Sequence, residues 1–483
     1  MRKENIFFNN FLWRFLERTG AQGVSFIVSI VLARLLEPTV YGTVALVTVF
    51  TSLMQVFVDS GLGNALIQKK DADDLDFSSV FYFNIAVCSV LYLGLFFLAP
   101  LIASFYNNAE LTLIVRAVGL TLIISGVKNI QQSYVSKNLL FKKFFYATLG
   151  GTIGAAIIGI WMAYRGYGVW ALVVQNLFNQ AIDTLILWIT VKWRPKRVFS
   201  FQRLKGLFSY GWKLLVSALI NVWYGDLRSL IIGKLYTSDD LAFYNRGDQF
   251  PNFFVKNINT SIDSILFPTM SLEQNNKARV RDMTRRSIKT STYLLMPFMM
   301  GLAVCAEPII RILLTEKWLP SVFFLRVFCF TYAFYPVHTA NLNAIKALGR
   351  SDYFLKLEII KKVMGLSVLA ATMFISVEAM ALSGIGTSIL SQIINSWPNR
   401  KLLDYHYSDQ VRDMLPQIGL SCLMGGIVYC VGFLGLNDWL TLLIQVPLGA
   451  VIYVAGSKLF HIDSFEYVLG ILKGYLGERK KTA

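Results

Sequence analysis

The chain has 483 residues, of which 55% are hydrophobic and 16% are charged, and its mean hydropathy is +0.52. A soluble protein of this size could not bury so much apolar surface, so the composition predicts an all-α integral membrane protein. The net charge is +17, but the Lys and Arg residues concentrate in short connections between apolar runs. This distribution is typical of membrane orientation and argues against a nucleic-acid partner.

Fourteen apolar windows of about 20 residues follow in chain order, and each is long enough to cross a hydrocarbon layer roughly 30 Å thick. They lie at residues 11–33, 40–63, 78–100, 111–133, 144–164, 168–191, 209–234, 241–270, 286–313, 322–346, 357–377, 379–403, 415–436 and 439–460. The predicted domains are an N-terminal six-helix lobe at 1–200, a C-terminal six-helix lobe at 201–405, two extra transmembrane helices at 406–462 and an amphipathic cytoplasmic tail at 463–483. The tail carries an apolar stripe and a basic end, which favours an interfacial helix over a solvated tail.

Basic residues in the connections predict the orientation of the spans. KWRPKRVFSFQRLK, after the sixth window, carries six Lys or Arg residues, and SLEQNNKARVRDMTRRSIK, after the eighth, also carries six. IASFYNNAE, after the third window, carries none. Because basic connections stay in the cytoplasm, both termini are expected to be cytoplasmic.

The two halves of the chain resemble each other in two places. LARLLEPTVYGTVAL, at the end of the first window, resembles IGKLYTSDDLAFYNR, at the end of the seventh. NIQQSYVSKNLLFKK (129–143) faintly matches NLNAIKALGRSDYFLK (341–356). Six spans followed by six similar spans predict a duplicated transporter whose site lies between the halves.

Several kinds of catalytic and metal chemistry have no motif in the chain. Neither a GxxxxGK[ST] phosphate loop nor HExxH occurs, and the only three histidines are His338, His406 and His461. The five cysteines lie in apolar runs without paired spacing, so no disulfide framework, metal site or cofactor is expected. The outward connections are about ten residues or fewer, which is within the range of ordinary loops and leaves little room for an extracytoplasmic catalytic site. The sequence therefore indicates a transporter and not an enzyme.

Polar residues recur at three- to four-residue spacing inside several windows, which places them on one face of each helix. The stripes contain Arg14 and Arg18 in the first window, Asn221, Tyr224 and Arg228 in the seventh, and Arg246, Gln249, Lys256 and Asp263 in the eighth. Lys128 ends the fourth window. Because unsatisfied polar groups that face lipid are costly, these stripes are expected to meet in the interior, most simply around a wet cavity.

The cations also have a simpler interpretation. Arg14 and Lys128 lie near the cytoplasmic ends of their windows, where their long side chains could reach the headgroups. Arg228 and Arg246 could reach the outer surface in the same way. The excess of cations over anions nevertheless favours an anionic cargo, and Arg forks suit phosphate oxygens.

Three carboxylates carry alternative interpretations. Asp226 and Asp263 are either counter-charges for the cations or proton carriers. Asp59, near the cytoplasmic end of the second window, either helps to close an inner gate or responds to protonation, or it is a helix-end residue paired with a nearby Lys.

Two long segments resemble a known family. VFVDSGLGNALIQKKDADDLDFSSVFYFN (56–84) is similar to the second-span signature of bacterial polysaccharide exporters. Residues 265–327 resemble the eighth-to-tenth-span region of the same family, including its E-K-W triplet at Glu316, Lys317 and Trp318. The looser similarity extends over essentially the whole chain. It indicates the Wzx-like branch of the multidrug/oligosaccharidyl-lipid/polysaccharide (MOP) superfamily, nearest to the colanic-acid and teichuronic-acid exporters.

The resemblance implies a flippase for an undecaprenyl-diphosphate-linked oligosaccharide of capsule, exopolysaccharide or O-antigen synthesis in the bacterial cytoplasmic (inner) membrane. It also implies a V-shaped, MATE-like pair of lobes, alternating access, and cavity cations that bind the lipid diphosphate. By helix position alone, Arg18 and Arg246 correspond to arginines of the related peptidoglycan-precursor flippase. In relatives, extra C-terminal helices can form a groove for the lipid tail. Expected partners are the lipid-linked oligosaccharide and membrane lipids, and other membrane proteins of the pathway are left open.

We therefore hypothesise that Arg18, Arg228 and Arg246 bind the diphosphate. The wider substrate-binding set adds Arg14, Lys128, Lys256, Asn221, Tyr224 and Gln249, and the gating or coupling set is Asp59, Asp226 and Asp263. A MATE-type drug or cation exporter is the alternative, although it predicts an acid-rich cavity and bases predominate here. A membrane-embedded glycan polymerase or ligase is disfavoured by the short outward connections, and a non-transporting scaffold is a further alternative.

Overall fold

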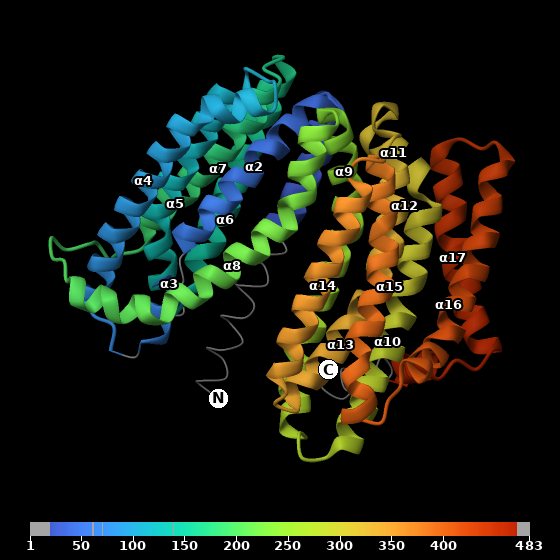
Figure 1. Cartoon of the computed structure of the whole chain (residues 1–483). Coiled ribbons are helices and arrows are strands. Elements are labelled where there is room, and N and C mark those ends of the chain that lie inside the picture. The colour runs from blue at the N-terminus through green and yellow to red at the C-terminus, as the bar shows by residue number, and fades with distance from the viewer. Residues whose placement is uncertain (1–19, 60–61, 70, 139, 471–483) are drawn as a thin grey trace, which may run out of the picture. The chain divides into compact units, whose positions relative to one another are not determined.

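The computed structural model describes residues 20–59, 62–69, 71–138 and 140–470, and every regular element within these ranges is helical (Figure 1). The helices are Gly20–Leu35, α2 (Pro38–Asp59), α3 (Leu62–Gln68), α4 (Asp74–Phe105), α5 (Leu111–Lys137), α6 (Phe141–Tyr164), α7 (Val169–Thr190), α8 (Phe201–Leu235), α9 (Ser238–Leu272), α10 (Lys277–Val304), α11 (Ala306–Leu314), η1 (Glu316–Trp318), α12 (Ser321–Ala333), α13 (Tyr335–Ala347), α14 (Ser351–Thr372), α15 (Val377–Leu402), α16 (Tyr407–Cys430), η2 (Val431–Leu434) and α17 (Asp438–Leu459). Residues 463–470 form one further helix.

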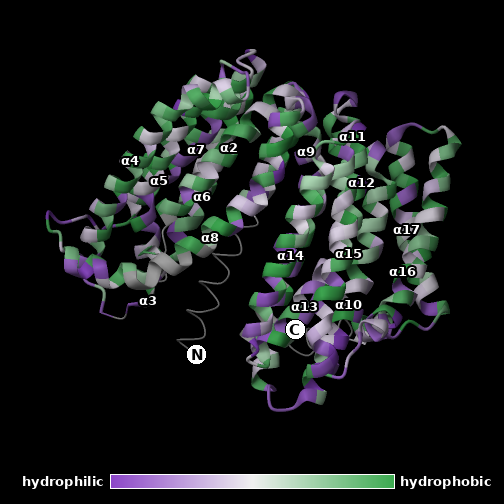
Figure 2. Cartoon of the chain, viewed as in Figure 1, coloured by the Kyte–Doolittle hydropathy of each residue, from purple (hydrophilic) through white to green (hydrophobic). Residues whose placement is uncertain are grey.

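Eight helices of the described chain are long and apolar enough to cross a membrane, and α10 with α11, bent by 66° at their junction, would form a ninth. Figure 2 shows hydrophobic residues along the lengths of the helices, with hydrophilic residues gathered mainly at their ends. The predicted all-α, multi-pass membrane fold is confirmed. The count of fourteen spans stays a prediction, because the long helices α8 and α9 carry polar stripes and the 322–346 window is divided between α12 and α13.

The same helix–break–helix pattern occurs in both halves of the chain. The first described helix ends at Leu35 and α2 begins at Pro38, whereas α8 ends at Leu235 and α9 begins at Ser238. These are the two segments that resemble each other in sequence. The break also fixes packing, because a Cβ added at Gly42 of α2 would lie 1.8 Å from the carbonyl oxygen of Ser238. Only glycine allows the two backbones to come so close.

The first of two compact units spans Met1–Ala242. Within it α4 packs against α5, α6 against α7, and α8 against both α2 and α3. One cluster of buried side chains joins α3, α4, α5 and α7 to the start of α8, and includes Leu66, Phe77, Ile130, Leu187 and Leu204. The predicted lobe boundary at residue 200 stays a prediction, but these contacts place α8 with the first unit.

The second compact unit spans Phe243–Ala483. Its helix α10 packs against α12, α13 and α16, and α16 packs against α17. Arg285 of α10 donates two hydrogen bonds of 2.7 Å to the buried Asp413 carboxylate of α16, which also accepts one from the Tyr405 hydroxyl at 2.8 Å. The 463–470 helix is fastened to α10 by a 2.6 Å bond between Lys289 Nζ and Asp463, and this bond lowers the pKa of Asp463.

Candidate functional site

The close approach of α9 and α12 positions Arg246, a buried cation of the second unit. A Cβ at Gly247 would lie 2.5 Å from Phe324 Cβ and 2.8 Å from the backbone nitrogen of Leu325. Because Gly247 has no side chain, α9 rests directly on α12 at this level. The neighbouring residue on α9 is Arg246, and the contact therefore fixes the depth at which Arg246 enters the unit.

Arg246 is a buried cation, and two of its contacts are with neutral groups. Its side chain is among the buried polar groups, at 4% exposure. Nη1 donates a 2.6 Å hydrogen bond to Gln249 Oε1, and the guanidinium carbon lies 4.9 Å from the ring centroid of Trp318 in η1. An amide oxygen and an aromatic face orient the planar fork of Arg without neutralising its charge. The arrangement is chemically suited to an anionic group that binds at the fork.

Several other polar residues of α9 bond to α12 and α13. Asp248 accepts a 2.6 Å hydrogen bond from the Tyr332 hydroxyl, and Asp263 accepts one of 2.8 Å from Asn343. Thr339 donates to Asn259 Oδ1 at 2.6 Å. Of these residues only Asp263 belongs to the predicted polar stripe, and its place beside a wet cavity stays a prediction. Because amide and hydroxyl groups on α13 are available, helix packing already satisfies these side chains.

In the first unit the polar residues of α8 have a different environment. Ser52 of α2 donates a 2.5 Å hydrogen bond to Asp226 Oδ2, which ties α8 to α2. Asp226 forms no ion pair with any described residue, and the half-buried Arg228 has neither a hydrogen bond nor an ion pair there. Asn221 is exposed and Tyr224 is half-buried, and both lie on the same face as Arg228 by spacing.

Lys128 lies inside the first unit, between α5 and α7. Its Nζ forms a 3.1 Å ion pair with Asp183 Oδ2 and also donates to Gln180 Oε1. Both charged side chains are only 12% exposed. A cation paired in this way neutralises a buried carboxylate, and it needs no substrate to explain its burial. Its assignment to the substrate site stays a prediction.

The remaining predicted site residues are placed only in part. Arg14 and Arg18 lie outside the described residues, and so does the side chain of Asp59, the last residue of α2. Gln249 and Lys256 are exposed on α9, and Gln249 is bonded to another predicted site residue, Arg246. Within the described ranges, no group of three or more His, Cys, Asp or Glu side chains could hold a metal ion.

A polar cluster among α13, α14 and α15 was missed by the sequence analysis. Glu358 and Lys361 of α14 form a 2.5 Å ion pair, with side chains 32% and 17% exposed. In the neighbouring helices, His338 Nδ1 lies 3.1 Å from Asn395 Nδ2. The spacing E-x-x-K inside the 357–377 window was the available signal, because residues three apart meet on a helix surface.

An apolar groove of about 440 Å³ lies among α10, α11, α16 and α17. Phe298, Met424, Val446 and Tyr453 line it, and Gln445 is one of its few polar residues. The groove therefore offers hydrocarbon contacts in the part of the chain that contains the two helices beyond the predicted twelve-helix repeat.

Membrane-length helices, with charged and amide side chains buried inside the units that they form, define a multi-pass membrane protein. The family follows from sequence comparison: residues 31–323, more than half of the chain, match the family described as polysaccharide biosynthesis protein. The chain belongs to this family, which confirms the resemblance.

Two relatives have descriptive names. The succinoglycan biosynthesis transport protein ExoT of Rhizobium meliloti is 25% identical over 307 residues, which cover 63% of this chain and 62% of that protein, less than two thirds of its length. The teichuronic acid biosynthesis protein TuaB of Bacillus subtilis is 24% identical over 414 residues, covering 84% of this chain and 85% of the relative.

The fold also matches a solved structure. The lipid II flippase MurJ, in an inward closed conformation, has a TM-score of 0.75 and 14% identity, covering 94% of this chain and 99% of MurJ. This similarity confirms the predicted fold of the MOP superfamily, and at this identity it concerns the fold alone.

Proposed function

We propose that the chain is a flippase that moves an undecaprenyl-diphosphate-linked oligosaccharide across the bacterial cytoplasmic membrane by alternating access. The cargo would be a repeat unit of a capsule, an exopolysaccharide or an O-antigen. The observation that carries the proposal is membership of the polysaccharide biosynthesis family over residues 31–323. The name of the relative ExoT, a succinoglycan biosynthesis transport protein, supports export as the step.

Such a flippase must move the polar head of its substrate through the hydrocarbon layer of the membrane. Sugar hydroxyls and a diphosphate cannot cross hydrocarbon unaided, whereas the polyprenyl tail can remain in an apolar environment throughout. The apolar groove among α10, α16 and α17 is a site of suitable chemistry for that tail. Buried cations provide the complementary environment for the diphosphate.

Arg246 is the first candidate for the diphosphate ligand. Its fork is held by the Gln249 amide oxygen and the Trp318 ring, and a planar guanidinium held in this way matches the geometry of two phosphate oxygens. In the first unit, Arg228 is the second candidate because no described residue pairs with it. Asp226 lies two residues before Arg228 and accepts a hydrogen bond from Ser52, which ties this part of α8 to α2.

The proposed location of the termini and the proposed partners are inferred from the sequence pattern. The basic connections after the sixth and eighth windows support a cytoplasmic location for both termini. The substrate partner is a lipid-linked oligosaccharide that enters laterally from the bilayer. Other membrane proteins of the glycan pathway remain open as partners.

The test is the sidedness of a lipid-linked oligosaccharide in sealed vesicles. A fluorescent diphosphate-linked oligosaccharide lipid is placed in both leaflets, and a membrane-impermeant reagent destroys only the outward-facing pool. Vesicles with the purified chain are expected to expose the whole pool, whereas protein-free vesicles expose about half of it, as two symmetric leaflets dictate. An unchanged protected pool would refute the proposal. Transport of a cationic dye in the same vesicles, without movement of the oligosaccharide lipid, would favour the drug-exporter alternative instead.

A further inference from the structure

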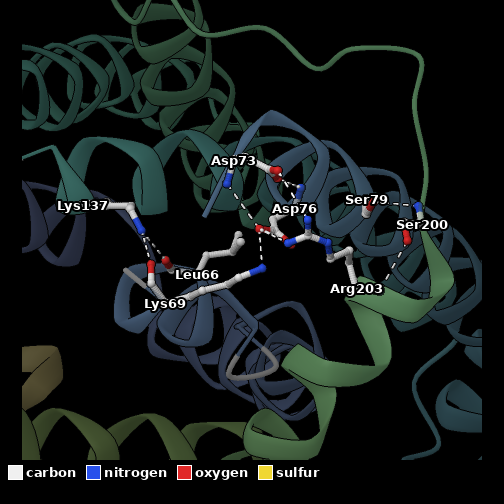
Figure 3. A network of polar contacts seen from close by, with 8 residues as sticks. All are labelled: Leu66, Lys69, Asp73, Asp76, Ser79, Lys137, Ser200 and Arg203. Carbon is white, nitrogen blue, oxygen red and sulfur yellow. Dashed lines mark hydrogen bonds and ion pairs between the residues drawn. The ribbon is translucent and has the colours of Figure 1, made fainter. Parts of the chain in front are cut away.

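The connection between α7 and α8, together with the first two turns of α8, is fastened to the start of α4. We refer to residues 191–208 as the basic segment. The backbone N–H of Lys196 donates to Ser78 Oγ at 3.0 Å, and that of Ser200 donates to Ser79 Oγ at 2.9 Å (Figure 3 draws the second bond). Trp193 Nε1 donates to Asp74 Oδ1 at 3.0 Å. These bonds hold the segment in one conformation against the first unit.

Part of the positive charge of the basic segment is neutralised by acids at the start of α4. Lys196 Nζ lies 2.6 Å from Asp74, and this carboxylate raises the pKa of Lys196. Arg203 reaches the fully buried Asp76 at 3.6 Å and Asp73 at 3.7 Å, as Figure 3 shows. These paired cations attach the segment to the start of α4.

Three further cations of the same segment have no such partner. Lys192, Arg197 and Lys205 are exposed, and none of them forms an ion pair or hydrogen bond with its side chain in the described part of the chain. Between them lie exposed aromatic rings, whose exposed fractions are 53% for Phe199, 69% for Phe201 and 43% for Phe208. Leu204 and Leu207 point the other way and are buried. The outer face of the segment is therefore basic and aromatic at once.

The segment lies at the level where a bilayer ends. It begins directly after Thr190, the last residue of α7, and beside Asp74, the first residue of α4. Both helices are long and apolar enough to span a membrane. Figure 1 shows the first part of α8 lying across the end of the first unit's helices. Lipid headgroups are the surroundings expected at this level.

We propose that the basic segment is a docking surface for anionic phospholipid headgroups. Lys192, Arg197 and Lys205 bind phosphate oxygens, and Phe199, Phe201 and Phe208 insert at the boundary between headgroups and hydrocarbon. The complementarity of charge argues for lipid, because a surface with three unpaired cations and three exposed rings repels basic partners and matches an anionic interface. The fastening to α4 means that the surface is preformed and loses little conformational freedom on binding.

The test compares two charge-matched variants of the full-length protein. One carries Lys192→Gln, Arg197→Gln and Lys205→Gln. The control carries Lys277→Gln, Lys356→Gln and Lys401→Gln, three other exposed cations that have no side-chain partner among the described residues. Each protein is placed in nanodiscs of phosphatidylglycerol and phosphatidylcholine in equal amounts, and co-released lipids are counted by native mass spectrometry. Thermal unfolding in detergent checks that both variants fold.

The expected result is a loss of preference for phosphatidylglycerol in the first variant only. Each of the three cations of the basic segment, which lie beside exposed rings at the headgroup level, contributes about a fivefold preference for anionic lipid, so the triple change lowers the ratio of bound phosphatidylglycerol to phosphatidylcholine by on the order of 100-fold. The charge-retaining variant Lys192→Arg with Lys205→Arg keeps the wild-type ratio. High salt removes the wild-type preference, because the cations are exposed. The proposal is overturned if the ratio is unchanged in the first variant, or if the control variant lowers it equally.

Discussion

Substitution of Gly247 by Ala tests whether the contact between α9 and α12 determines the position of Arg246. The new Cβ would lie 2.5 Å from Phe324 Cβ and 2.8 Å from the Leu325 nitrogen, whereas ordinary contacts are about 3.5–4.0 Å. The neighbouring Leu325 atom belongs to the backbone, so the two helices must separate by about 1 Å. Overpacking of this kind costs about 1–3 kcal/mol, and the better helix propensity of Ala returns at most about 1 kcal/mol.

We expect a net loss of about 1–2 kcal/mol, which corresponds to a fall in the apparent melting temperature of roughly 2–8 °C. Separation of α9 from α12 also moves Arg246 away from Trp318, so translocation in vesicles is expected to fall with stability. The assay is a thermal scan in detergent combined with the sidedness measurement. Gly386→Ala is the matched control, because nothing lies within 4 Å of a Cβ there. Equal melting temperatures of the two variants would refute the reasoning.

The remaining predictions concern three charged contacts. Lys128→Met should lower the free energy of unfolding of the first unit by about 3–5 kcal/mol, because it leaves Asp183 buried and unpaired. Addition of Asp183→Leu should restore this stability, and chemical denaturation measures both variants. A Lys128→Met variant as stable as the wild type would contradict the pairing. Arg285→Gln should lower the free energy of unfolding by about 1–3 kcal/mol in the same measurement, because the buried Asp413 then accepts a hydrogen bond only from the Tyr405 hydroxyl among the described residues. Arg279→Gln, which removes an exposed ion pair, should leave the free energy of unfolding almost unchanged. The pKa of Asp463 is lowered from its ordinary value of 3.8, so the bond to Lys289 stabilises the folded protein fully above that pH. This stabilisation is lost as the pH falls through the lower folded-state pKa. A spin label on the 463–470 helix should therefore become mobile in acid, and Asp463→Asn should abolish that transition.

The positions of the helices could be predicted largely from apolar windows. The windows 144–164 and 168–191 agree with α6 and α7, because the two predominantly apolar runs are separated by the turn that contains Gly166 and Gly168. The 322–346 window contains two helices, α12 and α13, and its role as one span stays a prediction. Pro336 stands in the first turn of α13, where its missing N–H costs nothing, and it was the overlooked signal for the break between α12 and α13.

The candidate site was less predictable, because its contacts are long-range. The i, i+3 spacing of Arg246 and Gln249 predicted a shared face, and the structure joins them by a hydrogen bond. No periodicity could identify Trp318 as the ring beside Arg246, nor Asp183 as the partner of Lys128, because these pairs depend on how separate helices pack. Spacing fixes the face of a helix, and tertiary packing decides what that face meets.

The most direct measurement of the central claim is the translocation rate of a diphosphate-linked oligosaccharide lipid in vesicles that contain Arg246→Ala. Arg326→Ala is the control, since Arg326 is a half-buried Arg of the same unit that bonds only to the carbonyl oxygen of Ala303 among described residues. Loss of charge-assisted hydrogen bonds worth about 1.5–3 kcal/mol predicts a roughly 10- to 100-fold slower rate for Arg246→Ala and a nearly unchanged rate for the control. Wild-type translocation by folded Arg246→Ala would contradict the claim that this cation binds the diphosphate.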